Sequence, residues 1–248
     1  MGSSSVIWLQ WATCAVVTVL VLTRLPALLR GHNRLMFWLL TLLDLAVLLS
    51  IEGPYLVLDQ LLGGHNTANL LLRFIIFGFC LLLGVRVARA FSGFRAERIL
   101  LGPIGLGLLG VASAILVASF VLAGLTTSRV GFFTADLELW PAVYGTMGRL
   151  YPTFTGLVLL PVLTETVRRR GPGLLRAAAA ALALGYIALA FSNIITVLPK
   201  EALWLSQTIN YGTILLLCLG LTLVWISSLV GRFRRRSMVE NHVKNPQS

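Results

Sequence analysis

Residues 68–89 have the sequence ANLLLRFIIFGFCLLLGVRVAR, an apolar run of 22 residues that ends in Arg86 and Arg89. A helix rises about 1.5 Å per residue and the hydrocarbon core of a bilayer is about 30 Å thick, so this run is long enough to cross a membrane. Lipid offers the backbone no hydrogen-bonding partner, which favours a helix over irregular structure. The run therefore predicts a transmembrane helix, and this helix carries one charge, Arg73, within it.

Other apolar stretches of similar length occupy most of the remaining sequence. Of the 248 residues, 57% are hydrophobic and only 12% are charged, which excludes a soluble globular protein. The sequence predicts an all-α integral membrane bundle of seven helices, with a membrane domain over residues 1–231 and a basic cytoplasmic tail over 232–248. The expected spans are Ser5–Leu25, Leu35–Leu58, Ala68–Arg89, Ile99–Leu125, Trp140–Val167, Leu174–Leu198 and Leu203–Val230.

The distribution of basic residues predicts the orientation of this bundle. Sixteen of the 20 Lys and Arg residues fall at one set of span edges, whereas only Arg129 and Lys200 fall at the opposite set. Basic residues in short connections are retained on the cytoplasmic side of a membrane. We therefore expect a multi-pass protein of the cell membrane with its N-terminus outside and its C-terminus in the cytoplasm.

The same basic residues suggest a partner for the cytoplasmic face. A net charge of +11 on a soluble protein would suggest nucleic acid, but here the charge lies at membrane edges. We expect it to contact anionic lipid headgroups or a membrane or cytoplasmic protein partner, and not nucleic acid. The residues expected to make these contacts are Arg95, Arg98, Arg168, Arg169, Arg170, Arg234, Arg235 and Arg236.

Four ionisable residues lie inside the predicted spans, namely Asp44, Glu52, Arg73 and Arg149. Each costs about 2.5–3.5 kcal/mol near the centre of a bilayer, so each should face the bundle and find a partner. Glu52 and Arg73 lie at matching depths below the outer surface, which predicts an ion pair between adjacent helices. Arg149 lies slightly deeper and could reach either acid.

Further polar residues at a similar depth predict a pocket that opens to the outside and binds a small molecule or an ion. A structural polar network that binds nothing is the alternative. Gly53 and Pro54 follow Glu52 directly and predict a kink or a local unwinding there. The candidate site residues are Asp44, Glu52, Arg73, Arg149, Tyr151, Asn193, Gln207 and Asn210.

The sequence gives no support for catalysis, a metal site or a bound cofactor. His32, His65 and His242 fall in connections, and the three cysteines lie far apart inside apolar runs. No pair of ligands at helical spacing results, and no catalytic triad or glycine-rich phosphate loop is present. We therefore expect a protein that is not an enzyme.

Residues 52–69, EGPYLVLDQLLGGHNTAN, resemble the corresponding region of an actinobacterial family of seven-span proteins described as transporters. A basic connection after the fifth span and the Gly-Leu-Thr-Leu pattern at residues 220–223 are also similar. Members of that family often carry a cytoplasmic C-terminal domain, whereas only the basic tail over residues 232–248 is expected here, and His65 stands where proline is common. The matching positions in the quoted segment are Pro54, Leu58, Asp59, Leu62, Gly63, Asn66 and Asn69.

Three functions fit this pattern. A receptor-like or regulatory membrane protein fits the odd number of spans, the outward polar pocket and the basic inner face. A small-solute or ion transporter is the alternative, although transporters usually consist of paired halves, which seven spans do not provide. The third is an interaction protein of the membrane, such as a prophage-encoded exclusion or immunity factor.

Overall fold

The computed structural model describes residues 2–31, 34–124, 139–195 and 203–244, and helices are the regular elements in these ranges. Long apolar runs give the long helices, and glycine, proline and polar residues separate them. The elements are α1 (Gly2–Leu29), α2 (Arg34–Leu48), α3 (Glu52–Leu61), α4 (Thr67–Ala90), α5 (Phe94–Leu101), α6 (Pro103–Ala123), α7 (Leu139–Arg168), α8 (Gly173–Ile195) and α9 (Leu203–Lys244).

Six helices, α1, α4, α6, α7, α8 and α9, contain a segment long and apolar enough to cross a membrane. The prediction of an all-helical, multi-pass membrane protein is therefore confirmed. The second predicted span, Leu35–Leu58, is not one helix, because it consists of α2 and α3, which are bent by 95° with respect to each other. Counting this pair as one broken span gives seven.

The break between α2 and α3 has a local cause. In a continuous helix the amide of residue 54 would donate a hydrogen bond to the carbonyl of Ser50, but proline has no amide hydrogen. Ile51 adopts an extended backbone (φ −92°, ψ 130°), and a new helix starts at Glu52. Pro54 then lies in the first turn of α3, where a missing N–H costs little.

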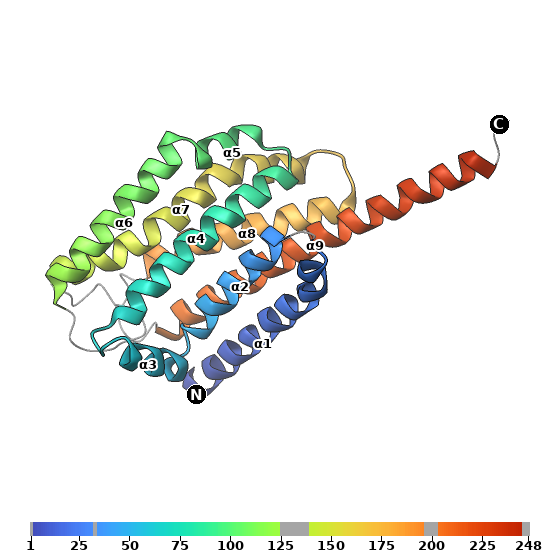
Figure 1. Cartoon of the computed structure of the whole chain (residues 1–248). Helices are drawn as coiled ribbons and strands as arrows, with labels where there is room; N and C mark the ends of the chain where they lie inside the picture. The colour runs from blue at the N-terminus through green and yellow to red at the C-terminus, as the bar shows by residue number, and fades with distance from the viewer. Residues whose placement is uncertain (1, 32–33, 125–138, 196–202, 245–248) are drawn as a thin grey trace.

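Two other predicted boundaries differ from the structure. The predicted span Ile99–Leu125 divides into α5 and α6 at Gly102, whose backbone is extended (ψ 179°) and precedes Pro103. The last helix continues past the predicted end at Val230 to Lys244, so α9 projects beyond the bundle (Figure 1). A charged sequence can continue a helix into water once the apolar part has anchored it in the bundle.

The helices form a ring. Around this ring α1 packs on α2, α2 on α4, α4 on α7, α7 on α8, α8 on α9, and α9 on α1 again. Helix α6 packs outside the ring on α7 and α4, and the short helix α5 joins α4 to α6 (Figure 1). Small residues on α7, including Gly148 and Gly156, let side chains of its neighbours approach the α7 backbone closely.

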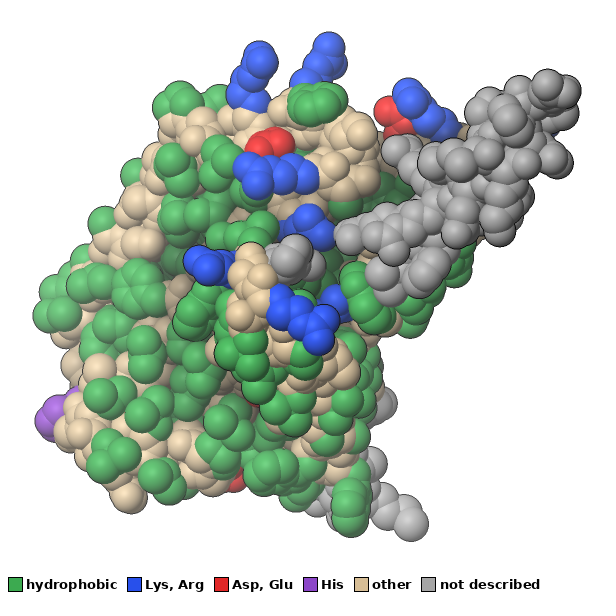
Figure 2. Space-filling view, turned by 45° about the vertical axis from the view of Figure 1, so that its right-hand side comes forward, with side chains coloured by type: hydrophobic (Ala, Val, Ile, Leu, Met, Phe, Trp, Pro, Cys, Tyr) green, Lys and Arg blue, Asp and Glu red, His purple; other side chains and the backbone are tan. Residues whose placement is uncertain are grey.

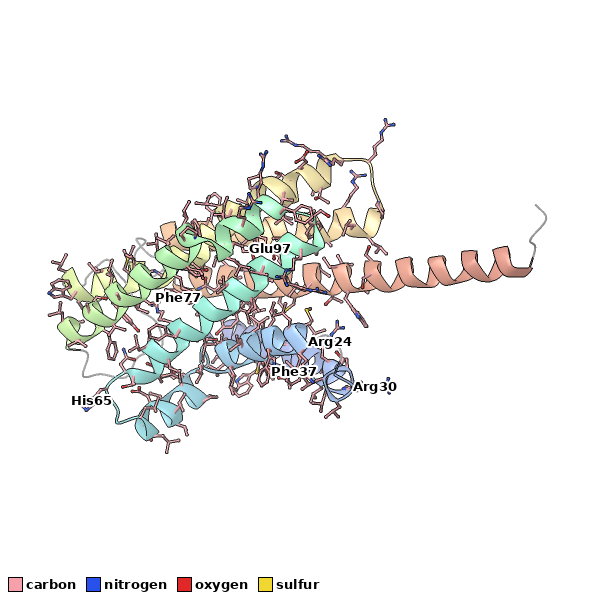
Figure 3. All side chains as sticks on the ribbon, turned by 45° about the horizontal axis from the view of Figure 1, so that its top comes forward. Arg24, Arg30, Phe37, His65, Phe77 and Glu97 are labelled. Carbon is pink, nitrogen blue, oxygen red and sulfur yellow. The ribbon has the colours of Figure 1, made fainter. Side chains whose placement is uncertain are left out.

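The molecule has two chemically different ends and an apolar side surface. Lys and Arg side chains gather at one end, called here the arginine-rich end, and hydrophobic side chains cover the sides (Figure 2). His65 lies at the opposite end from Arg24 and Arg30 (Figure 3), and this opposite end is called the His65 end. Large apolar side chains such as Trp8 (76% exposed) and Val121 (70% exposed) point outward, as expected for a protein surrounded by lipid.

Candidate functional site

Asp59 on α3 fixes the connection to α4 at the His65 end. The Asp59 carboxylate is fully buried and accepts hydrogen bonds from the backbone amides of Asn66 (3.0 Å) and Ala68 (2.9 Å). Ala68 lies in the first turn of α4, where the helix dipole favours a negative charge. Tyr55, one turn before Asp59, donates its hydroxyl hydrogen to the side chain of Asn66. The broken segment is therefore fastened firmly to the start of α4.

Asn69 and Arg73 lie on the next turns of α4, where they contact α7. The side-chain oxygen of Asn69 accepts hydrogen bonds from the Tyr144 hydroxyl (2.9 Å) and from Nε of Arg73 (3.4 Å). Nη1 of Arg73 donates to the carbonyl oxygen of Gly145 on α7 (3.4 Å). The Arg73 guanidinium also lies 5.3 Å from the centre of the Tyr144 ring, a cation–π distance. Neutral groups thus hold this buried cation in place.

Gly148 provides the space that the Arg73 guanidinium occupies. A Cβ atom added at Gly148 would overlap Nη1, Cδ and Cζ of Arg73. Arg73 is only 8% exposed, so it has little room to move aside. The lack of a side chain at position 148 therefore decides that Arg73 can lie against α7.

Arg149, the next residue on α7, brings a second positive charge to this place. Its side chain is half-buried, and it follows Gly148, against which the Arg73 side chain lies. Within the described part of the chain, the ion pairs join Arg89 to Glu97 and Arg169 to Glu165, both at the arginine-rich end. Neither Arg73 nor Arg149 thus has a described carboxylate within 4.0 Å. We call Asn69, Arg73, Tyr144, Gly148 and Arg149 the Arg73 site.

The predicted ion pair between Glu52 and Arg73 is not present. Glu52 is exposed in the first turn of α3, where it follows the break in the chain. The predicted kink beside Pro54 is present, but its angle of 95° removes the matching depth on which the predicted ion pair depended. Asp44 does not approach either arginine closely enough for an ion pair, and its carboxylate accepts a hydrogen bond from Thr18 on α1 (2.9 Å).

The remaining candidate residues fall in three groups. Tyr151 is fully buried against Phe77 (ring centroids 5.6 Å apart), and its hydroxyl has no hydrogen-bond partner among the described residues. Asn210 on α9 is exposed. The side chains that lie outside the described part of the structure are those of Asn193, Gln207, Arg234, Arg235 and Arg236.

Five of the eight basic residues expected to meet lipid headgroups or a partner have described side chains, and these five are exposed. Arg95 and Arg98 lie on α5 and are exposed at the arginine-rich end. Arg168 ends α7, and Arg169 and Arg170 follow it, all three being exposed. Arg169 is also paired with Glu165 one turn earlier, at 2.5 Å.

Sequence reasoning missed the central roles of Asp59, Asn69 and Tyr55. Asp59 was named among the matching positions of the family resemblance and was given no place in the candidate site, yet it is fully buried. The close spacing of Asp59, Asn66 and Asn69 after a helix-breaking Pro54 was the available indication, because polar side chains in such a turn commonly bond to free amides of the next helix. The hydrogen-bond acceptor of Arg73 on α7, the Gly145 carbonyl, had no indication in the sequence, since it is a backbone group.

Replacing Glu52 with glutamine should leave the stability of the protein unchanged within about 0.5 kcal/mol. Glu52 is exposed and makes no described ion pair, so removing its charge leaves no buried partner behind. Unfolding in detergent micelles by titration with SDS, followed by circular dichroism, measures the difference. A loss of more than 2 kcal/mol would contradict this expectation and would indicate that Glu52 and Arg73 form a stabilising ion pair.

Comparison of the chain with protein-family models, with curated proteins and with solved structures gives no match. Among the described residues, no group of three or more His, Cys, Asp or Glu side chains could hold a metal ion. What the site can do therefore follows from its own geometry. The Arg73 site combines the positive charges of two arginines with the side-chain amide of Asn69 and the phenol of Tyr144. Such a combination is suited to binding an anion.

Proposed function

We propose that this multi-pass membrane protein is a receptor-like or regulatory protein that binds a small anion at the Arg73 site. In this proposal the helix pair α2–α3 is a broken span, so the chain crosses the cell membrane seven times. The His65 end faces outward and the arginine-rich end faces the cytoplasm, as the positive-inside rule requires. The ligand reaches the site from outside, and no catalytic step is involved.

One observation carries the proposal, namely two neighbouring arginines without a described carboxylate partner. Arg73 is buried, and its own contacts are neutral groups on α4 and α7. An arginine inside a bilayer costs about 2.5–3.5 kcal/mol, and a second one beside it adds repulsion. A bound anion would offset both costs. The planar guanidinium fork matches carboxylate, sulfate and phosphate oxygens, which can accept two hydrogen bonds at once.

The position of the site suggests how binding could change the protein. Arg73 belongs to α4 and Arg149 to α7, so an anion held by both arginines draws these two helices together. Pro152, one turn beyond Arg149, leaves the Gly148 carbonyl without its usual helical donor and makes α7 easier to bend there. A ligand that binds the closer arrangement of the two helices better would shift the population toward it.

The test is anion binding by the purified protein in micelles of a neutral detergent. Isothermal titration with sulfate, phosphate, acetate and succinate should detect at least one binder, and Arg73→Gln and Arg149→Gln should each weaken it at least about tenfold, because each removes a charge-assisted hydrogen bond. Arg170→Gln, which removes an exposed charge, serves as the control. Equal binding by the wild type and the three variants, or no binding by any of them, would contradict the proposal.

A small-solute or ion transporter is the second candidate, and the broken pair α2–α3 favours it. Transporters often form their substrate sites beside discontinuous helices, and here the break lies at the same end as the Arg73 site. Uptake of the anion identified above by sealed vesicles separates the two functions. Uptake that Arg73→Gln abolishes supports a transporter, whereas binding without uptake supports a receptor-like protein.

A further inference from the structure

A second group of unpaired cationic side chains lies at the arginine-rich end, far from the Arg73 site. Arg24 on α1 is only 7% exposed, and its guanidinium lies 4.0 Å from the centre of the Trp225 ring on α9. The Nε atom of Arg24 is buried and has no hydrogen-bond partner among the described residues. Burial of an arginine donor without an acceptor is unfavourable, so an acceptor at this place would be stabilising.

Arg86 on α4 supplies a second charge to the same place. Helices α1 and α4 both pack on α2, and Arg24 and Arg86 lie near the ends of α1 and α4. The glutamates described at this end, Glu97 and Glu165, pair with Arg89 and Arg169 instead. No described carboxylate therefore neutralises Arg24 or Arg86.

The depth of these side chains corresponds to the border between hydrocarbon and headgroups. Arg24 lies five residues before the end of α1, and Arg86 lies four residues before the end of α4. Trp225 lies seven residues before Arg232, where the sequence of α9 turns from apolar to basic. At about 1.5 Å per residue, the two arginines lie roughly 6–8 Å inside their helix ends, and Trp225 lies roughly 10 Å before the first basic residue of α9. Tryptophan is enriched at this depth because its ring is amphipathic.

We propose that Arg24 and Arg86 bind the phosphate of an anionic phospholipid, with Trp225 as the platform on which Arg24 stacks. Basic pockets between transmembrane helices on the cytoplasmic side are suited to phosphate headgroups. The depth and the bordering tryptophan favour a lipid over a soluble phosphate, because the acyl chains can remain in the bilayer while the phosphate reaches the two arginines. The bound lipid would join α1 to α4 at the end where α9 leaves the bundle. This site is independent of the proposed function of the Arg73 site.

The experiment is native mass spectrometry of the full chain, released from detergent micelles that contain phosphatidylglycerol or phosphatidylcholine. We expect one phosphatidylglycerol to remain bound more tightly than the rest, and the double variant Arg24→Gln, Arg86→Gln to bind it at least about tenfold more weakly. Arg176→Gln, which removes an exposed charge near the start of α8, should bind it as the wild type does. Arg24→Lys should weaken binding less than Arg24→Gln, because it keeps the charge and loses the planar fork.

Three results would overturn the proposal. The first is equal retention of phosphatidylglycerol and phosphatidylcholine by the wild type. The second is unchanged retention by the double variant, provided that its circular dichroism shows the wild-type helix content. The third is displacement of the lipid by millimolar inorganic phosphate, which would assign the two arginines to a soluble anion.

Discussion

Replacing Asp59 with alanine should lower the free energy of unfolding by about 4 kcal/mol, because two buried backbone amides lose a charged acceptor. These amides belong to Asn66 and Ala68, at 3.0 and 2.9 Å from the Asp59 carboxylate. Hydrogen bonds to charged groups contribute about 1.5–3 kcal/mol each, and water cannot easily replace an acceptor that is fully buried. Titration of the micellar protein with SDS, followed by circular dichroism, measures the loss.

The neighbouring residue Gln60 provides the matched control. It lies on the same helix and is exposed, so Gln60→Ala should change the stability by no more than about 0.5 kcal/mol. Asp59→Asn keeps one acceptor oxygen, so its loss of stability should lie between that of Gln60→Ala and that of Asp59→Ala. A loss below about 1 kcal/mol for Asp59→Ala would show that the connection from α3 to α4 does not depend on this carboxylate.

Replacing Gly148 with alanine should destabilise the protein by about 3 kcal/mol, although alanine is the better helix former. The new Cβ atom would overlap the Arg73 guanidinium, which must then leave the Gly145 carbonyl. Overpacking of a tight interior typically costs about 1–3 kcal/mol, and the buried arginine loses an acceptor in addition. The same SDS titration measures the effect.

Gly107 on α6 is the matched glycine, because an added Cβ there meets no atom within 4 Å. Gly107→Ala should leave the stability equal or raise it by up to about 1 kcal/mol. The double variant Gly148→Ala, Arg73→Ala tests the mechanism, since truncating Arg73 makes room for the new methyl group. If the penalty of Gly148→Ala were the same in the presence and in the absence of the Arg73 side chain, contact between them would not be its cause.

The membrane class could be predicted from the sequence because it depends on properties that need no tertiary structure. A run such as residues 68–89 is long and apolar enough to span a bilayer in any arrangement of neighbours. The confirmed predictions, an all-helical chain and several apolar spans, are of this kind. The inside–outside orientation rests on the same local information, namely arginines next to span ends, and stays a prediction.

The candidate site was predicted only in part. Arg73 and Arg149 were expected in one polar region, with Arg149 slightly deeper, and they lie on α4 and α7, which pack on each other. Their expected counter-charges, Glu52 and Asp44, do not join them, because the helix break at Ile51 sends Glu52 to the surface and Asp44 bonds to Thr18. The sequence did contain the cause of the break, Pro54, but not its angle of 95°.

The sequence by itself determined that this chain consists of apolar helices with their basic residues at one end. Hydropathy and charge act residue by residue, so their consequences can be predicted from the order of the amino acids. Only the tertiary structure decided that Arg73 lies in the space left by Gly148, that Asp59 holds the start of α4, and that Arg24 stacks on Trp225. These contacts join helices distant in sequence, and they depend on how the helices rotate and approach one another, which the packing of the whole ring determines.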